Sequence, residues 1–170
     1  MKTILFMAVS LDGKTAGDNG DTSWVSDEDV KPMDELMVDC GVMIMGSKTY
    51  DSFGDELPNE QALQVVMTTR ADLLNQKQDN VIFTDKKPAE VLAMLEEKGF
   101  EKVMLAGGEE LNSSFLKDGL LDEVWVIQKP LILGVGKSLF ETNAKMELRL
   151  VEEYKLSGDR KLLKYEKKEQ

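Results

Sequence analysis

The stretch VMLAGGEELNSSFLKDGLLDEVWVIQKPLILGVGKSLF, residues 103–140, decides the fold of this chain. A short apolar run at residues 103–106 ends at Gly107 and Gly108, and apolar residues at helical spacing follow immediately. This pattern predicts a strand that enters a helix through a glycine pair. Glycine lets the backbone turn sharply and approach a ligand closely, and the first N–H groups of the new helix attract an anion, most commonly a pyrophosphate.

The rest of the chain alternates between strand-like and helical patterns. Helices are predicted from Ser26 to Asp39, from Ser47, and from Pro88 to Gly99, with Pro32 expected to kink or restart the first. Such alternation predicts a mostly parallel sheet covered on both faces, in one three-layer α/β/α domain spanning residues 1–170. A Ser-Gly-Asp turn predicts that the last two strands form an antiparallel hairpin. The predicted strands are residues 3–11, 42–45, 63–68, 81–84, 102–106, 123–133, 148–155 and 161–167.

The composition excludes several classes of protein. Lysine and arginine number 21 against 32 aspartates and glutamates, a formal charge of −11 that disfavours nucleic acid or anionic lipid as partners. The chain has no histidine, which removes histidine-based catalysis and most zinc sites, and its single cysteine, Cys40, is interpreted as a core residue. The apolar N-terminus is interpreted as a first strand and the protein as cytoplasmic, because no apolar run reaches the ~18 residues of a membrane span.

Three predicted strands end in residues suited to binding phosphate. Besides the glycine pair, these are Gly46-Ser47-Lys48-Thr49 and Thr68-Thr69-Arg70, which offer hydroxyls, one ammonium and one guanidinium. Taken singly, each has a simpler explanation as a turn, a helix cap or a solvated charge. Together they favour one crevice at the carboxyl ends of parallel strands, where open α/β sheets bind ligands.

With these motifs in place, the chain resembles the dihydrofolate reductase superfamily. It is most similar to the reductase domain of the bifunctional riboflavin-biosynthesis deaminase–reductase. The resemblance covers nearly the whole chain, and its markers are SLDGK at 10–14, MGSKTY at 45–50, AGG at 106–108 and the segment 115–136.

The resemblance implies an NADPH site and a homodimer. Ala8, Ala16 and Gly17 would line the nicotinamide and its ribose. Thr68, Thr69 and Arg70 would recognise the 2′-phosphate that distinguishes NADPH from NADH. The pyrophosphate would lie between two segments, Gly46, Ser47, Lys48 and Thr49 on one side and Gly107, Gly108, Glu109, Glu110 and Leu111 on the other.

On the substrate side, Asp12, Trp24 and Asp29 are the candidate residues. Five residues separate Trp24 from Asp29, the interval found between the tryptophan and the substrate-binding carboxylate of bacterial dihydrofolate reductases. Asp29 is therefore a candidate catalytic residue that would protonate or orient a heterocycle. It also lies three residues after Ser26, where an acidic side chain stabilises the start of a helix. Both alternatives stay open.

The sequence thus predicts an NADPH-dependent oxidoreductase that transfers hydride to a small heterocyclic substrate. The resemblance implies 5-amino-6-(5-phosphoribosylamino)uracil as that substrate. One alternative is a dihydrofolate reductase, opposed by Ala62, which stands where those enzymes place an arginine for the glutamate tail. Another is an NADP-binding protein without catalysis, suggested by Ser47 and by the absence of a substrate-phosphate arginine. A metal site built from residues 27–29 is discounted, because acidic runs are usually solvated.

Overall fold

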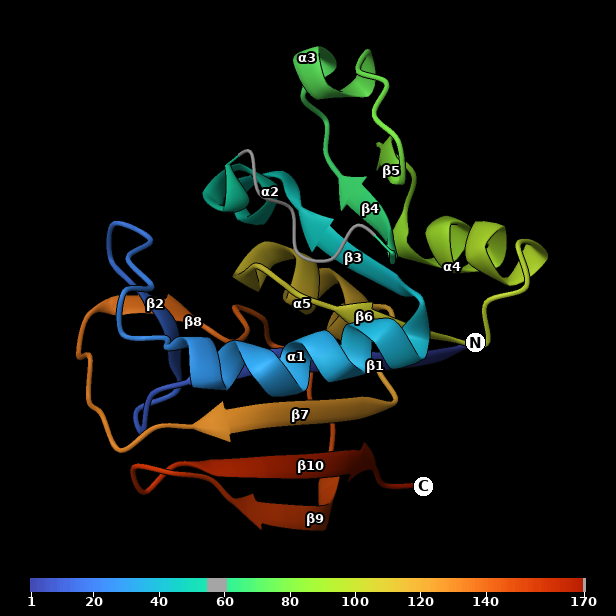
Figure 1. Cartoon of the computed structure of the whole chain (residues 1–170). Helices are drawn as coiled ribbons and strands as arrows, with labels where there is room; N and C mark the ends of the chain where they lie inside the picture. Colours follow the sequence, from blue (N-terminus) through green and yellow to red (C-terminus); the bar gives the residue numbers. More distant parts are fainter. Residues whose placement is uncertain (55–60, 170) are drawn as a thin grey trace.

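The computed structural model of the chain describes residues 1–54 and 61–169. Its eight-stranded sheet has the order β5-β4-β3-β6-β1-β7-β10-β9 (Figure 1). Neighbours from β5 to β7 are parallel, whereas β10 is antiparallel to both β7 and β9. The predicted terminal hairpin is therefore confirmed. The strands are β1 (Lys2–Val9), β3 (Val42–Gly46), β4 (Leu63–Met67), β5 (Val81–Thr84), β6 (Lys102–Leu105), β7 (Glu123–Gln128), β9 (Leu148–Lys155) and β10 (Lys161–Lys167).

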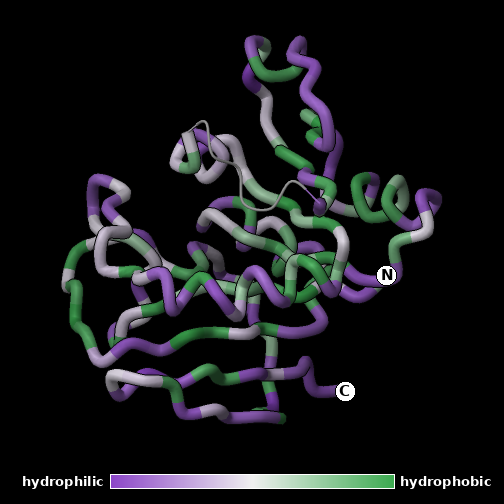
Figure 2. Tube along the Cα trace, viewed as in Figure 1, coloured by the Kyte–Doolittle hydropathy of each residue, from purple (hydrophilic) through white to green (hydrophobic). Residues whose placement is uncertain are grey.

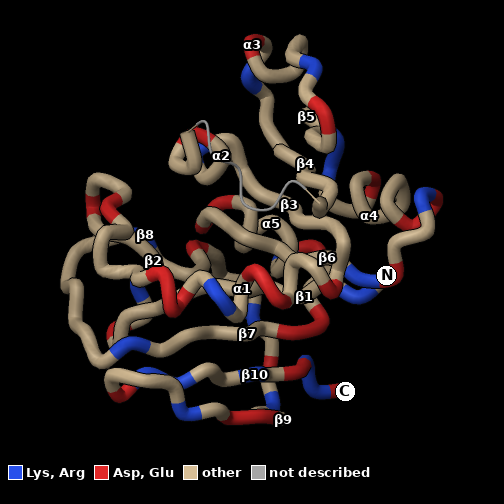
Figure 3. Tube along the Cα trace, in the orientation of Figure 1, with Lys and Arg blue, Asp and Glu red and all other residues tan. Residues whose placement is uncertain are grey.

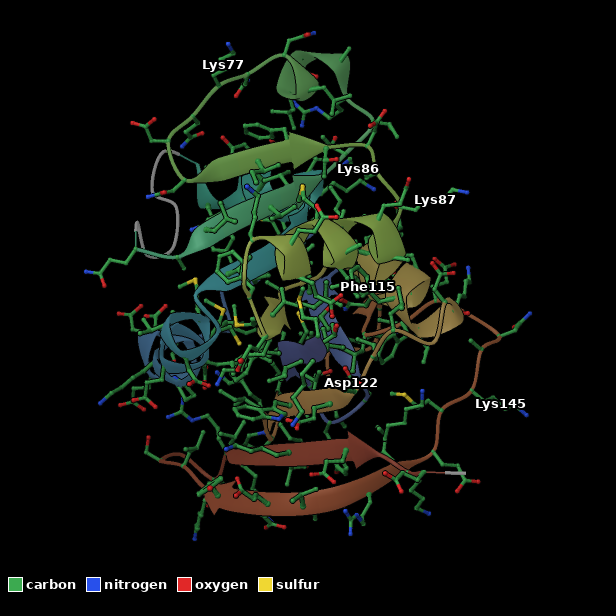
Figure 4. All side chains as sticks on the ribbon, turned by 90° about the vertical axis from the view of Figure 1, so that its right-hand side faces the viewer. Lys77, Lys86, Lys87, Phe115, Asp122 and Lys145 are labelled. Carbon is green, nitrogen blue, oxygen red and sulfur yellow. The ribbon has the colours of Figure 1, made fainter. Side chains whose placement is uncertain are left out.

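Helices cover both faces of this sheet. Helices α1 (Asp27–Cys40) and α2 (Ser47–Phe53) contribute to one core cluster, and α4 (Pro88–Glu97) and α5 (Glu109–Lys117) to the other. Apolar residues concentrate along the central strands between these layers (Figure 2). Phe115, on α5, is fully buried there (Figure 4). The predicted three-layer architecture is confirmed, and the short helix α3 (Ala71–Leu74) follows β4.

Helix α1 begins where the sequence predicted. Ser26 precedes its first turn, and the Ser26 N–H donates to the Asp29 carboxylate at 2.8 Å. The helix continues through Pro32, so the predicted restart there is wrong. Pro32 lies in the second turn, where the missing N–H removes only one hydrogen bond. Cys40 is buried at the end of the helix, and this burial raises the pKa of its thiol to about 11.

A second, two-stranded sheet was not predicted. Its strands β2 (Lys14–Gly17) and β8 (Gly136–Ser138) are antiparallel and too short and polar to show a strand pattern. Gly136 makes the pairing possible, because a Cβ on it would lie 2.2 Å from the Ala16 carbonyl oxygen. In the described part of the chain, no helix has the length and apolar character needed to cross a bilayer.

Candidate functional site

The carboxyl ends of β3, β4 and β6 lie side by side, because β3 pairs in parallel with both neighbours. The Gly46 N–H donates to the Gly107 carbonyl at 2.8 Å, which joins the turn after β3 to the turn after β6. The Lys48 ammonium and the Glu110 carboxylate, 3.0 Å apart, add a contact between α2 and α5. Two of the three predicted phosphate-type segments are thus adjacent, and the third follows the next strand, β4 (Figure 1).

The two glycines of the pair have different surroundings. Gly107 has φ +84°, and a Cβ on it would lie 3.1 Å from the Met7 sulfur, so the fold itself requires glycine there. A Cβ on Gly108 would meet only the Thr49 hydroxyl, at 3.7 Å. The peptide bond between the two glycines is cis. The space beside Gly108 is therefore open to a ligand that approaches the backbone.

The first turn of α5 anchors the chain around β8. The Glu109 carboxylate accepts the Ser138 N–H at 2.7 Å, and the Asn112 amide donates to the Leu139 carbonyl at 3.0 Å. Leu111 is buried in the core. In this arrangement the side chains of Glu109 and Leu111 support the fold, so any ligand at this turn would meet mainly backbone.

The third segment places Arg70 among carboxylates. Thr68 is buried, and its hydroxyl accepts the Arg70 N–H at 3.1 Å, which fixes the turn after β4. The Arg70 guanidinium contacts the Asp51 carboxylate of α2 at 2.5 Å and the Asp72 carboxylate at 2.7 Å. Hydrogen bonds to Asp72 and Asp51 raise the pKa of Arg70 above its ordinary value, so the side chain stays charged.

Around the end of β1, Asp12 joins two loops. Its carboxylate accepts hydrogen bonds from the Ser10 hydroxyl at 2.6 Å and from the N–H groups of Leu133 and Gly134 at 3.1 and 2.8 Å. These bonds, with the Ser10 hydroxyl first, lower the pKa of Asp12 to about 2. Of the residues predicted to line a nicotinamide, Ala8 lies on β1 against the α1-side core, and Ala16 and Gly17 lie on β2. Asp12 thus fixes the loop that carries β2.

Asp29 lies in a buried cluster of charges at the start of α1. One of its carboxylate oxygens accepts from the Lys129 ammonium at 2.6 Å and from the Ser26 hydroxyl at 2.8 Å. The other accepts from the Arg160 guanidinium at 2.5 Å. The side chain of Asp29 is fully buried, and those of Lys129 and Arg160 are 13% and 9% exposed. Asp29 therefore has the helix-start geometry and, in addition, two cationic partners.

These contacts determine the ionisation of Asp29. Burial opposes the charged form, but hydrogen bonds from Lys129, Ser26 and Arg160 outweigh it and lower the pKa to about 2. Arg160 is also fully engaged, because its remaining N–H groups donate to the Ser26 hydroxyl, to Glu28 and to the Ser157 carbonyl and hydroxyl. At neutral pH Asp29 is an anion held by cations, a state that suits orientation of a neighbour and not donation of a proton.

An open pocket of about 560 Å³ adjoins this cluster. Residues from the start of α1, the end of β7 and the β9–β10 turn line it, among them Ser26, Lys129 and Arg160. On the inner side, the Lys129 ammonium donates to the Trp24 carbonyl at 2.5 Å and lies 5.7 Å from the centre of the Trp24 ring. The Trp24 indole N–H is buried and has no partner among the described residues.

Sequence reasoning missed Lys129 and Arg160. Lys129 follows the last residue of β7, and its N–H donates to the Val9 carbonyl, so it extends the strand beside β1. The signal in the sequence that could have identified Lys129 is its position as a cation directly after an apolar strand. Arg160 lies in the terminal hairpin, 131 residues from Asp29, and no sequence pattern connects the two.

Comparison with known proteins gives a consistent result. The model of the RibD C-terminal domain matches residues 1–162. The 2,5-diamino-6-ribosylamino-4(3H)-pyrimidinone 5′-phosphate reductase of Methanothermobacter thermautotrophicus is 27% identical, over 92% of this chain and 94% of its own. The uncharacterised protein YwjB of Bacillus subtilis is 28% identical, over 88% of each. A crystal structure from Shewanella sp. PV-4 has a TM-score of 0.84 at 26% identity, over 99% of this chain and 100% of that one. The resemblance stated from the sequence is confirmed.

Proposed function

The chain belongs to the RibD C-terminal domain family, the reductase domain of riboflavin biosynthesis, and we propose that it is an NADPH-dependent reductase. The observation that carries the proposal is the junction of the β3 and β6 turns, with open space beside Gly108. A pyrophosphate fits such a place, because it can approach backbone N–H groups that no Cβ shields. The bound coenzyme would supply the hydride.

The residues of this chain would bind and orient the coenzyme. The two joined turns, at residues 46–49 and 107–108, would hold the pyrophosphate. Ala8, Ala16 and Gly17 would border the nicotinamide, where small side chains leave room for a flat ring. Thr68, Thr69 and Arg70 would recognise the 2′-phosphate through two hydroxyls and a guanidinium.

For the substrate we propose a phosphoribosylamino-pyrimidine, with 5-amino-6-(5-phosphoribosylamino)uracil as the first compound to test. The reductase from Methanothermobacter is named for a substrate of this chemical class. Asp12, Trp24 and Asp29 would border the substrate. Asp29, with a pKa of about 2, would orient polar groups as an anion, so the proton that accompanies hydride transfer would come from another donor.

A dihydrofolate reductase is less well supported. Ala62 is 1% exposed and packs in the core on the α1 side of the sheet, so it offers a folate tail neither a cation nor surface. Weak binding of methotrexate is therefore expected.

The test combines binding with turnover. NADPH and NADH are titrated against the protein by tryptophan fluorescence, and loss of NADPH absorbance is followed with the uracil substrate. Micromolar NADPH binding with substrate-dependent oxidation supports the proposal. Binding of NADPH without its oxidation in the presence of the uracil substrate would favour a non-catalytic NADP-binding protein, and tight methotrexate binding with dihydrofolate turnover would favour the folate enzyme.

We also propose that the chain forms a homodimer. The support is β9, an edge strand whose residues Leu150, Val151 and Tyr154 are 46%, 47% and 46% exposed. An edge strand with unpaired backbone groups and apolar side chains is suited to pairing with another chain. A second copy of the chain would pair the backbone groups of β9 and bury its apolar side chains.

A further inference from the structure

Arg70, the guanidinium proposed to recognise a 2′-phosphate, is already held by two carboxylates. Asp72 accepts from its Nε at 3.3 Å and from its Nη2 at 2.7 Å, which is a bidentate contact. Asp51 accepts from Nη1 at 2.5 Å. Three of the five N–H donors are therefore engaged, and the guanidinium and its two partners sum to a charge of −1.

The two carboxylates come from different elements. Asp72 lies in α3, two residues beyond Arg70, whereas Asp51 lies in α2, whose first turn belongs to the proposed pyrophosphate site. Acidic and basic residues alternate around α3 (Figure 3). Hydrogen bonds from Arg70 lower the pKa of Asp72, so that carboxylate is ionised at neutral pH. A dianionic phosphate approaching Arg70 would meet both negative charges.

Arg70 is the cation in the turn that directly follows β4. Lys48 pairs with Glu110. Lys86 and Lys87 follow β5, one strand further out, and are exposed (Figure 4). Arg70 is therefore the first candidate for recognition of the phosphate.

We propose that Asp51 and Asp72 set the discrimination between NADPH and NADH, because they compete with the 2′-phosphate for Arg70. The inference rests on the proposed function. The side chains of Asp51 and Asp72 are 50% and 61% exposed, so each can turn into water when a phosphate displaces it. NADH carries no 2′-phosphate and leaves the Arg70 contacts in place. The carboxylates therefore weaken NADPH binding selectively.

The test is a double-mutant cycle with both coenzymes. Asp51→Asn keeps the shape of the side chain and removes its charge, so NADPH affinity should rise about fivefold, the factor that corresponds to a strong exposed ion pair. NADH affinity should change by less than about twofold, because NADH has no 2′-phosphate that would displace Asp51 from Arg70. Asp72→Asn should act in the same direction. In an Arg70→Ala background, Asp51→Asn should raise NADPH affinity much less, because no guanidinium is left to release.

The matched control is Asp39→Asn. Asp39 is 60% exposed and pairs with Lys102 at the start of β6, away from the proposed site. This variant should leave both affinities unchanged. If the wild type binds both coenzymes and Asp51→Asn leaves the ratio of NADPH affinity to NADH affinity unchanged, the inference is overturned and the proposed function is not. A wild-type protein that binds neither coenzyme would overturn the proposed function and the inference with it.

Discussion

The buried charges at the start of α1 predict how the folding stability of the protein depends on pH in the acid range. Asp29→Asn is nearly isosteric, yet it removes the negative charge that faces Lys129 and Arg160. Both cations are almost completely buried, at 13% and 9% exposure, and would lose their common partner. The variant should therefore fold less stably at neutral pH, and the loss should depend on pH.

The pKa shift gives the size of the effect. A pKa of about 2, against an ordinary 3.8, corresponds to about 2 kcal/mol of folding free energy at neutral pH. Removal of one partner from a buried ion pair costs roughly 3–5 kcal/mol, so we expect a loss of about 2–4 kcal/mol for Asp29→Asn. Because the folded-state pKa is depressed, this stability is present above the ordinary pKa. It is lost as the pH falls from about 5 towards 2.

Urea unfolding, followed by tryptophan fluorescence at pH 7.5, 5, 4 and 3, measures this difference. The wild type should exceed Asp29→Asn by the full amount at pH 7.5, and the two should converge at low pH. The control is Asp27→Asn, which alters an adjacent exposed carboxylate that forms no ion pair with any described residue. Equal stability of the wild type and Asp29→Asn at pH 7.5, or a difference that persists unchanged at pH 3, would refute the reasoning.

Further predictions concern the glycines and the edge strand. Gly108→Val should abolish NADPH binding in fluorescence titration while the urea midpoint stays near wild type, since the fold has room for a Cβ there; retained affinity would remove Gly108 from the site. Gly107→Ala should lower the urea midpoint, because the residue has φ +84° and a Cβ would press on a methionine side chain. Gly136→Ala should separate β2 from β8 and speed hydrogen exchange in both, since its Cβ would overlap a carbonyl oxygen at 2.2 Å; unchanged exchange would contradict this. Leu150→Lys combined with Tyr154→Lys should convert a dimer to a monomer in light scattering, whereas a dimer that persists would exclude β9 as the interface.

The sequence predicted the fold well because the fold follows from local patterns. Apolar runs bounded by glycine mark the strands, and alternation with helices implies a parallel sheet. The last two predicted strands have the bounds that the structure shows. The turn after β6 was predicted from Gly107 and Gly108, two residues whose backbone requirements are visible in the sequence itself. The β2–β8 pair was missed because both strands are short and polar and contain no apolar run.

The partners of individual side chains could not be predicted in this way, because they depend on which loops the fold brings together. The sequence left two alternatives for Asp29, and neither included Lys129 or Arg160, at 100 and 131 residues' distance along the chain. Likewise Arg70 was predicted to recognise a 2′-phosphate, and no sequence pattern indicated that Asp51 reaches it from a neighbouring helix. In a chain with 32 acidic residues and 21 basic ones, a carboxylate from a neighbouring element can reach a cation near a turn, as Asp51 reaches Arg70. An anionic coenzyme that binds such a protein must compete for its cations, so the carboxylates beside a binding site belong to its specificity as much as the cations do.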